Sequence, residues 1–594
     1  MSRLANELWG RTVALALARS GVRLACVSPG SRSTPLVLAL AGVPDLRLVS
    51  CLDERSAAYF ALGAGRVGGG PAVVVTTSGT AVANLFPAVV EAAQSEAPLL
   101  LLTADRPARL RDADANQTIG QAGIFGAYAR FAIDVGEPSE DPAALRVLAA
   151  KVARAVAAAR GRPAGPAHLN VPFAKPLEPE RQAAVTAVAA PFEAARVPRH
   201  HVGVAGPPAA AVEDVARTLA AAQRPLLVCG AVPDSASVGA QALALARETG
   251  TPVLADPLSG ARFGPGATEV TAGAADRFLS DPAVRRALAP DVVLRVGSTP
   301  TSVSVQALLE EAGEAPQIVV DGGGRWKDHQ ALAASYVRAD EAGTLRALRE
   351  AGERSRSPER AAWTDLWRRA EGAAQEALRD ATTAVASADT ATLFEGAVAR
   401  EVAAAAPAGA TLFVSSSMPV RDLDAFAAPR DAALRVLGNR GASGIDGVVS
   451  SALGVSAGAP AAGPVIALIG DLALLHDANG LALAGAAPRC VFVVVNNDGG
   501  GIFQFLSIRE FEPEFTEHFA TPHGRDLSLL ASFHGLDHSE APNLGALPER
   551  LAAAVAAERS ALLEIRTERE SNRTAREAVT RRIVDAVTSA MPTT

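Results

Sequence analysis

The stretch VIALIGDL, residues 465–472, decides the fold class of this chain. Its aliphatic run, Val465 to Ile469, ends on Gly470 and Asp471, and a second run, Val491 to Val495, ends just before Asn497. Short, continuous apolar runs bounded by turn residues are typical of strands that are buried on both faces of a parallel sheet. The sequence therefore predicts two neighbouring buried strands with polar residues at their carboxyl ends.

The same pattern recurs along the chain, each time ahead of an Ala-rich helical stretch. The further predicted strands are Leu24 to Ser28, Ala72 to Thr76, Leu99 to Thr103, Leu226 to Cys229, Val292 to Val296, Ile318 to Val320 and Leu412 to Val414. We expect an α/β protein of three doubly wound domains with mainly parallel sheets, over residues 1–185, 200–340 and 385–570. A Pro-rich exposed linker, 176–208, and solvated helices, 339–388, are expected between them.

The residues at the two strand ends form an oxygen-rich set. Asn497 follows Asp471 by 26 positions, and ligands of open α/β sheets bind at the carboxyl ends of strands. A carboxylate, an amide carbonyl and the backbone carbonyl of Gly499 suit Mg²⁺ carrying phosphates. The alternative for Asp471 alone is an ordinary helix cap, but the spacing favours the metal site.

Composition excludes several classes of protein. The 594 residues carry 56 basic and 63 acidic side chains, a net charge of −7 that offers no general attraction to nucleic acid. No apolar stretch approaches the roughly 20 residues that span a bilayer, and the N-terminus lacks the features of a secretory signal, so we expect a cytoplasmic protein without a membrane anchor. The scattered cysteines, Cys26, Cys51, Cys229 and Cys490, predict buried, reduced thiols.

Two further motifs are weaker. The match to GxGxxG at 63–68 follows a helical stretch and precedes a strand, the reverse of a dinucleotide site, and so predicts a flexible helix-to-strand turn. His518, His523, His534 and His538 fit no common zinc spacing, which favours a surface segment or lid over a second metal.

The GD and NN pair resembles the thiamine diphosphate motif, with Leu472 where many members have Gly. Further stretches are similar to one family, 2-succinyl-5-enolpyruvyl-6-hydroxy-3-cyclohexene-1-carboxylate synthase of menaquinone biosynthesis. These are SPGSRST (28–34), DER (53–55), TSGTAVAN (77–84), TADRP (103–107), NQ (116–117), SSSMPVR (415–421) and GNRGASGIDG (438–447). The resemblance implies thiamine diphosphate and Mg²⁺, with Mn²⁺ as a substitute, and a homodimer or homotetramer. The first domain of one subunit then meets the last domain of another.

The resemblance also implies roles for residues around the cofactor. Glu54 matches the glutamate that hydrogen-bonds the aminopyrimidine N1′, and Ile445 matches the apolar wedge that bends the cofactor. Ser417, and Ser443 and Gly444 in the Gly-rich turn 441–447, match cofactor-binding loops, where such turns expose backbone N–H groups. From the residues alone, Glu54 is equally a first-turn acid at a helix start.

The substrates that the resemblance implies are 2-oxoglutarate and isochorismate, which are dicarboxylates and suit arginine. The substrate candidates are Ser31, Arg32, Arg106, Gln117, Arg421 and Arg440, with Ile502 and Phe503 as an apolar wall; Ser31, Arg32 and Gln117 join Glu54 as catalytic candidates. Relatives often carry a basic residue near Val303, whereas the stretch 299–304 has none, which leaves Arg295 or Arg325 to compensate only if the fold brings them round.

Two other functions stay open at this point. One is another thiamine diphosphate-dependent decarboxylase or carboligase, similar to acetolactate synthase. The other is a non-catalytic subunit that keeps the fold for assembly.

Overall fold

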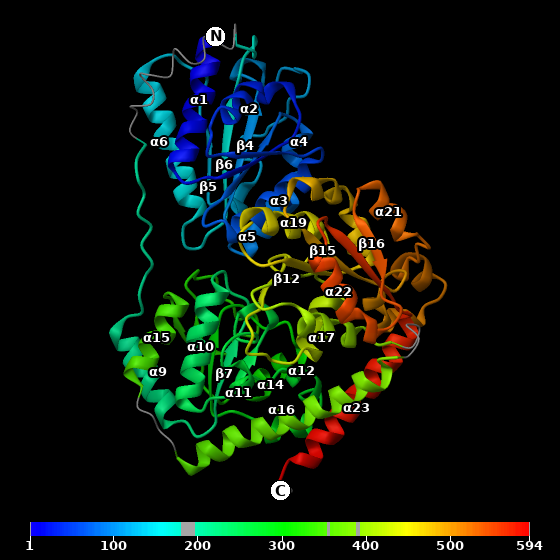
Figure 1. Ribbon diagram of the computed structural model, residues 1–594. Coiled ribbons are helices and arrows are strands. Elements are labelled where there is room, and N and C mark those ends of the chain that lie inside the picture. Colours follow the sequence, from blue (N-terminus) through cyan, green and yellow to red (C-terminus); the bar gives the residue numbers. More distant parts are fainter. Residues whose placement is uncertain (1, 180–196, 353–356, 388–392, 593–594) are drawn as a thin grey trace. The chain divides into compact units, whose positions relative to one another are not determined.

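The computed structural model describes residues 2–179, 197–352, 357–387 and 393–592, and they form three parallel sheets (Figure 1). The expected α/β class is confirmed, because every strand pairing in the three sheets is parallel. The chain divides into two compact units. The first unit holds residues 1–203, 439–461 and 476–488, and the second holds residues 204–438, 462–475 and 489–594. Residues 180–196 of the expected linker lie outside the described residues.

The first sheet has the order β2-β1-β3-β4-β6-β5. Its strands are β1 (Leu24–Val27), β2 (Arg47–Ser50), β3 (Ala72–Thr76), β4 (Leu99–Asp105), β5 (Phe131–Asp134) and β6 (Pro166–Pro172). One face packs on α1 (Arg3–Arg19), α2 (Thr34–Ala41) and α6 (Pro142–Ala159) through a core that includes Leu17, Val75 and Leu102. Helices α3 (Glu54–Val67) and α5 (Phe86–Gln94) pack together in the same unit, with α3 against β1 and β3.

The middle sheet has the order β11-β10-β9-β7-β8. Its strands are β7 (Pro225–Cys229), β8 (Val253–Ala255), β9 (Val292–Val296), β10 (Gln317–Val320) and β11 (Ala333–Val337). Successive residues of β7 alternate between two cores, as the two-residue period of a strand requires. Leu227 packs with α9 (Ala209–Ala221), α10 (Ser235–Thr249) and α15 (Glu341–Ala351), whereas Leu226 packs with α12 (Ala275–Phe278), α14 (Val303–Glu311) and α16 (Pro358–Val385).

The third sheet has the order β13-β12-β14-β15-β17-β16. Its strands are β12 (Thr411–Val414), β13 (Arg435–Leu437), β14 (Val465–Gly470), β15 (Cys490–Asn496), β16 (Asp537–Glu540) and β17 (Ala561–Arg566). One face shares the core that contains Leu226, together with α17 (Glu395–Ala405), α18 (Met418–Phe426), α22 (Leu547–Ala556) and α23 (Arg569–Ala590). A single apolar core therefore joins the middle and last sheets into the second unit.

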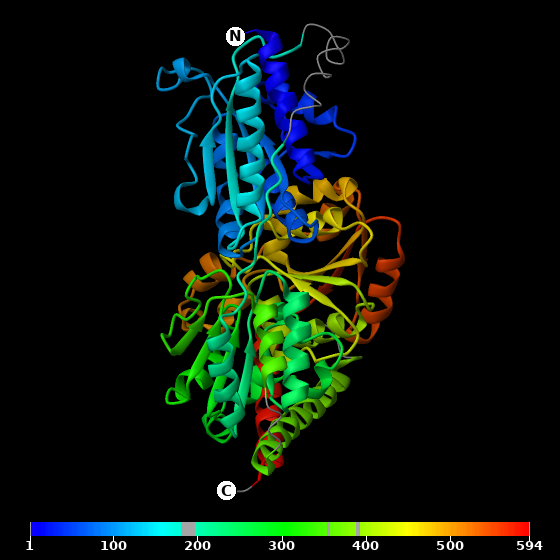
Figure 2. The ribbon, with the colours of Figure 1, turned by 90° about the vertical axis from the view of Figure 1, so that its left-hand side faces the viewer.

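Helix α16 corrects the expectation of solvated linking helices. It buries Trp363 and Trp367, which lie 3 % and 2 % exposed, in the core shared by the two sheets of the second unit. Figures 1 and 2 show α16 in green beside the C-terminal helix α23 in red. The prediction of a solvated helix was wrong because α16 has few apolar residues on its buried face and many charged residues on its outer face.

The GxGxxG segment is also corrected, because it belongs to α3 rather than to a turn. Helix α3 packs closely on α19 (Val448–Gly458) within the first unit (Figure 1). A Cβ at Gly63 would lie 2.1 Å from the Ser451 carbonyl oxygen, and one at Gly454 would lie 2.0 Å from that of Phe60. The glycines are needed for this close approach of two helix backbones.

All four cysteines are buried and unpaired, as expected. None of the described helices is both long enough and apolar enough to cross a membrane.

Candidate active site

Asp471 lies where the sequence predicted, directly after β14 and at the start of the short helix α20 (Asp471–His476). The side chain is 2 % exposed, and burial raises its pKa above the ordinary value. Its carboxylate accepts hydrogen bonds from the backbone N–H of Leu472, at 2.7 Å, and of Gly499, at 2.8 Å. These bonds fix the carboxylate against the loop that follows the neighbouring strand.

Asn497 follows β15, which pairs with β14 in parallel, so the two side chains leave the same edge of the sheet. Its Nδ2 donates to Glu395 Oε1 at 2.7 Å, and Thr567 Oγ1 donates to the same oxygen at 3.0 Å. The Asn497 Oδ1 atom is buried and has no hydrogen-bond partner in the part of the chain that the structure describes. Glu395 thus orients the amide so that its oxygen stays available.

These donors fit the expected divalent cation. A buried amide oxygen without a protein partner is rare in folded proteins, and such an oxygen commonly binds an ion or an ordered water molecule. A carboxylate and amide and backbone carbonyls are the oxygen ligands that Mg²⁺ accepts. The described residues contain no cluster of three His, Cys, Asp or Glu side chains, but the expected ligand set has only one such residue.

The loop after Asn497 is held in an unusual conformation. Asp498 and Gly499 have φ values of +57° and +138°, and a Cβ at position 499 would lie 2.0 Å from the Ala520 carbonyl oxygen. Arg569 Nη1 donates to the Asn497 carbonyl at 2.7 Å, and the Gly499 carbonyl accepts from the N–H of Gly501 at 2.9 Å. The Gly499 carbonyl oxygen keeps a second lone pair for a ligand.

The sequence predicted a surface segment or lid for the four histidines, but the His523 side chain is buried beside Asp471. Its side chain is only 7 % exposed, and its Nε2 lies 3.2 Å from Asp471 Oδ2. His518 is exposed, and His538 contacts the buried Glu564 at 3.1 Å. The sequence therefore missed two residues of this site, His523 and Glu395. The histidine cluster was a signal for the first, but nothing in the sequence marks Glu395.

Other candidates of the second unit surround this strand edge or its loops. Ser417 has a φ of +70° between β12 and α18, and its carbonyl accepts from Arg421 Nη1 at 2.6 Å. Ile502 and Phe503 are half-buried on a short helix (Gly501–Phe505), where Phe503 packs edge-on against Phe519. A Cβ added at Gly470 would meet nothing within 4 Å, which is consistent with an open position.

Glu54 belongs to the first unit and is the first residue of α3. Asp53 caps this helix, since its Oδ1 accepts from the N–H groups of Arg55, at 2.8 Å, and Ser56, at 3.3 Å. Glu54 is half-buried, and its Oε2 accepts from Asn84 Nδ2 at 3.2 Å. Glu54 is therefore the first-turn acid of α3, as expected from its position, and the capping role belongs to Asp53.

Three of the substrate candidates come together in the first unit. Arg106 Nη1 donates to Ser78 Oγ, and Gln117 Nε2 donates to the Ser78 carbonyl at 3.1 Å. Arg32 is 9 % exposed and Nη1 donates to the Phe173 carbonyl, while its buried Nε has no partner among the described residues. Burial, and then the charge of Arg106, lowers the pKa of Arg32. Two buried guanidinium groups this close suit an anionic ligand.

The remaining first-unit substrate candidates differ in exposure. Ser31 is exposed at the start of a short helical turn (Ser31–Ser33), and Arg440 is half-buried. Ser78, which hydrogen-bonds to both Arg106 and Gln117, lies in the stretch TSGTAVAN (77–84), but the sequence did not mark it as a site residue.

The Gly-rich turn departs from expectation in one respect. The N–H groups of Gly441 and Ala442 donate to the Glu91 carboxylate, at 3.0 Å and 2.7 Å, and so are not available to a phosphate. Glu91 is 1 % exposed and also pairs with Arg66 at 2.9 Å.

The candidate cofactor-binding residues of the turn follow Ala442. Ser443 has a φ of +62°, Ile445 is half-buried, and Asp446 accepts a hydrogen bond from Tyr59 Oη.

Of the two arginines that could replace the missing basic residue near Val303, Arg295 is already paired within the middle domain. Arg295 is 3 % exposed, and its Nη1 pairs with Asp328 at 2.7 Å. The Arg295 guanidinium therefore forms its ion pair within the middle domain. Arg325 is half-buried in the loop between β10 and β11.

The chain is similar to known proteins both in sequence and in fold. Residues 9–124 match the thiamine pyrophosphate enzyme family model for the N-terminal TPP binding domain. The benzoylformate decarboxylase structure from Polynucleobacter necessarius superposes with a TM-score of 0.68 at 15 % identity, over 94 % of this chain and 98 % of that one. This likeness concerns the fold alone.

Two relatives are similar over nearly their whole length. The 2-succinyl-5-enolpyruvyl-6-hydroxy-3-cyclohexene-1-carboxylate synthase of Halobacterium salinarum is 44 % identical over 601 residues, covering 98 % of both chains. The enzyme of the same name from Chloroflexus aurantiacus is 43 % identical over 567 residues, covering 95 % of this chain and 94 % of the relative. Identity at this level and coverage shows that the chain belongs to the 2-succinyl-5-enolpyruvyl-6-hydroxy-3-cyclohexene-1-carboxylate synthase family of thiamine diphosphate-dependent enzymes.

Proposed function

We propose that the chain decarboxylates 2-oxoglutarate and adds the resulting four-carbon unit to isochorismate in 1,4 fashion, as a step of menaquinone biosynthesis. The reaction needs thiamine diphosphate and Mg²⁺, for which Mn²⁺ substitutes. The observation that carries the cofactor assignment is the buried Asn497 Oδ1, which has no partner among the described residues and directly follows the strand that pairs with the one before Asp471. The family membership supplies the reaction class.

Residues of both units would bind the cofactor. Asp471, Asn497 and the Gly499 carbonyl would hold the cation and, through it, the diphosphate. Glu54 would hydrogen-bond the aminopyrimidine ring, and Ser417, Ser443, Gly444 and Ile445 would enclose the cofactor. When bound, the cofactor supplies the carbanion stabilisation that decarboxylation of a 2-oxo acid requires.

The substrate side rests on fixed positive charge. Arg32 and Arg106 would bind a carboxylate of the substrate, because buried guanidinium groups stay charged and form two parallel hydrogen bonds to a carboxylate. Ser78 and Gln117 hold Arg106 in place. Arg421 and Arg440 would serve the other carboxylates, with Ile502 and Phe503 as the apolar wall.

The assembly follows from the same assignment. We propose a homodimer or homotetramer in the cytoplasm, in which Glu54 of one subunit and Asp471 of another serve the same cofactor. A monomer would then be inactive.

The test is turnover by the purified chain with thiamine diphosphate, Mg²⁺, 2-oxoglutarate and isochorismate, followed by mass spectrometry of the product and by carbon dioxide release. We expect product only when both substrates are present. Turnover of pyruvate in their place would support the acetolactate synthase-like alternative, and no turnover of any 2-oxo acid would support a non-catalytic subunit.

A variant separates catalysis from binding. Glu54→Gln should lose most turnover while the cofactor still raises the thermal midpoint, since a ligand that binds only the native state stabilises it. Asp45→Asn is the matched control, because Asp45 is exposed in the same unit and should keep wild-type turnover. Undiminished turnover in Glu54→Gln would refute the assigned role.

A further inference from the structure

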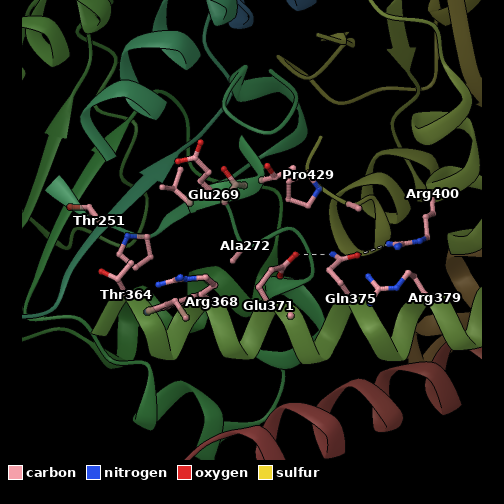
Figure 3. Close-up of a pocket in the computed structure, with 17 residues that line it drawn as sticks. Thr251, Glu269, Ala272, Thr364, Arg368, Glu371, Gln375, Arg379, Arg400 and Pro429 are labelled. Carbon is pink, nitrogen blue, oxygen red and sulfur yellow. Dashed lines mark hydrogen bonds between the residues drawn. The ribbon is translucent and has the colours of Figure 1, made fainter. Parts of the chain in front are cut away.

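A cavity of about 300 Å³ lies inside the second unit, between α16 and two segments of the middle domain, Thr251–Pro252 and Thr268–Ala272 (Figure 3). A second hollow of about 610 Å³ shares four of its lining residues, Arg379, Arg400, Ala428 and Pro429. The two hollows therefore form one cleft along α16 and α17. None of the residues assigned above to cofactor or substrate lines this cleft.

Two guanidinium groups meet at the shared end of the cleft. Figure 3 shows Arg379 from α16 beside Arg400 from α17. Burial lowers the pKa of Arg400, the charges of Glu401 and Glu371 oppose this effect, and the charge of Arg379 adds to it. Arg400 Nη1 donates to two neutral acceptors, Gln375 Oε1 at 2.8 Å and the Phe426 carbonyl at 2.9 Å. Within the described ranges, neither arginine forms an ion pair with a carboxylate, and Arg379 forms no hydrogen bond.

The acidic side chains of the cleft do not provide the missing partner. Glu371 is hydrogen-bonded to Gln375 Nε2, at 2.8 Å, and to the Ala274 N–H, at 3.0 Å, and burial raises its pKa. Burial also raises the pKa of Glu401 and the charge of Arg400 opposes this effect, but among the described residues the Glu401 carboxylate forms no ion pair with either arginine. Glu269 is already paired with Arg247 at 3.0 Å.

The other two arginines that line the cleft are used elsewhere. Arg368 pairs with Asp365, and Arg430 donates to carbonyls at the C-terminal end of α17, including that of Ala403 at 2.6 Å. The available positive charge is therefore concentrated on Arg379 and Arg400.

We propose that this cleft is a binding site for a small organic carboxylate, separate from the substrate site. The Arg379 and Arg400 guanidinium groups bind its carboxylate in the paired geometry that arginine favours. The apolar part of the ligand packs against Ala428 and Pro429, which line the same shared end of the cleft. The cavity is at the small end of the volumes that hold small-molecule ligands, which limits the ligand to a few carbon atoms or one ring.

The test uses isothermal titration of the full-length protein with benzoate and with inorganic phosphate, at constant ionic strength. We expect saturable benzoate binding at millimolar concentration and weaker or no phosphate binding. Arg379→Gln should weaken benzoate binding about ten- to a hundredfold, because it removes charge-assisted hydrogen bonds. Arg369→Gln is the matched control, since Arg369 is exposed on the same helix but does not line the cleft.

The substrate site is excluded by a second measurement. Arg379→Gln should leave the KM for 2-oxoglutarate unchanged, and Arg32→Gln, in the proposed substrate site, should leave benzoate binding unchanged. The proposal is overturned if benzoate does not bind, if phosphate binds equally well, if Arg32→Gln weakens benzoate binding as much as Arg379→Gln does, or if Arg379→Gln and Arg369→Gln weaken binding equally. Turnover that fails while benzoate still binds would count against the proposed function only.

Discussion

Removal of the Glu91 carboxylate should release the Gly-rich turn. Glu91 accepts from the N–H groups of Gly441 and Ala442 and pairs with Arg66, whose side chain is 12 % exposed. Burial lowers the pKa of Arg66, and the Glu91 charge opposes that effect. Removing one partner of a buried ion pair destabilises a protein by about 3–5 kcal/mol, because the other charge is left buried. We expect Glu91→Ala to have an effect of this size.

Hydrogen exchange at the two amides is the appropriate assay, because unfolding of a large chain of several domains is not a two-state process. A local loss of about 3 kcal/mol corresponds to roughly hundredfold faster exchange of the Gly441 and Ala442 amides. Glu91→Gln keeps one carbonyl oxygen as an acceptor and should lie between Glu91→Ala and the wild type. Glu213→Ala removes an exposed carboxylate and should leave these amides unchanged.

The outcome for the cofactor follows from the same geometry. Ser443, Gly444 and Ile445 continue directly from the two anchored residues, so Glu91→Ala should also weaken thiamine diphosphate binding. The reasoning is refuted if the amides of Gly441 and Ala442 exchange in Glu91→Ala as they do in the wild type.

Three further results are expected. Gly454→Ala should lower the midpoint of thermal unfolding, because its Cβ would overlap the Phe60 carbonyl, an overlap that costs about 1–3 kcal/mol. Gly372→Ala on α16, whose Cβ meets nothing within 4 Å, should keep or raise the midpoint, since alanine is favoured over glycine in a helix by up to about 1 kcal/mol; equal midpoints in the two variants would contradict this. Burial lowers the pKa of His168 to about 4, so between about pH 6.5 and 4 the unfolded chain binds a proton that the folded state resists, which costs about 3 kcal/mol. The urea midpoint should therefore fall more over this pH range in the wild type than in His168→Gln, and the same pH dependence in both would contradict this. Glu395→Leu should weaken Mg²⁺ binding about ten- to a hundredfold in calorimetric titration, because Asn497 Nδ2 loses its acceptor. Glu395→Gln retains an acceptor and should keep most of the affinity. Equal Mg²⁺ affinities in the two variants would show that Glu395 does not orient Asn497.

The strands that could be predicted from the sequence are those whose side chains are apolar on both faces. The predicted run Ala72 to Thr76 matches β3, and Val292 to Val296 matches β9. Edge strands such as β16, with the sequence DHSE, carry no apolar run and could not be found in this way. Strand β6 is fully buried but includes the polar residues His168 and Asn170, which hydrogen-bond to Thr103 of the neighbouring strand.

The site could be predicted where a residue follows a recognisable strand, as Asp471 and Asn497 do. Residues that act through a partner far along the chain could not. Glu91 resembles any acid on a helix, and its partner Gly441 lies 350 positions away. Glu395 is similar, because its contact with Asn497 spans 102 positions.

The discontinuity of the first unit sets an order of events during synthesis. Its early segment ends at Gly203, but its last segment ends at Pro488. At about 5–20 residues per second, the ribosome needs roughly 15–60 s to produce the roughly 285 residues between them. During that interval the face of α3 that contains Gly63 is not covered by α19. The nascent chain should therefore depend on a chaperone until translation of the third sheet is well advanced.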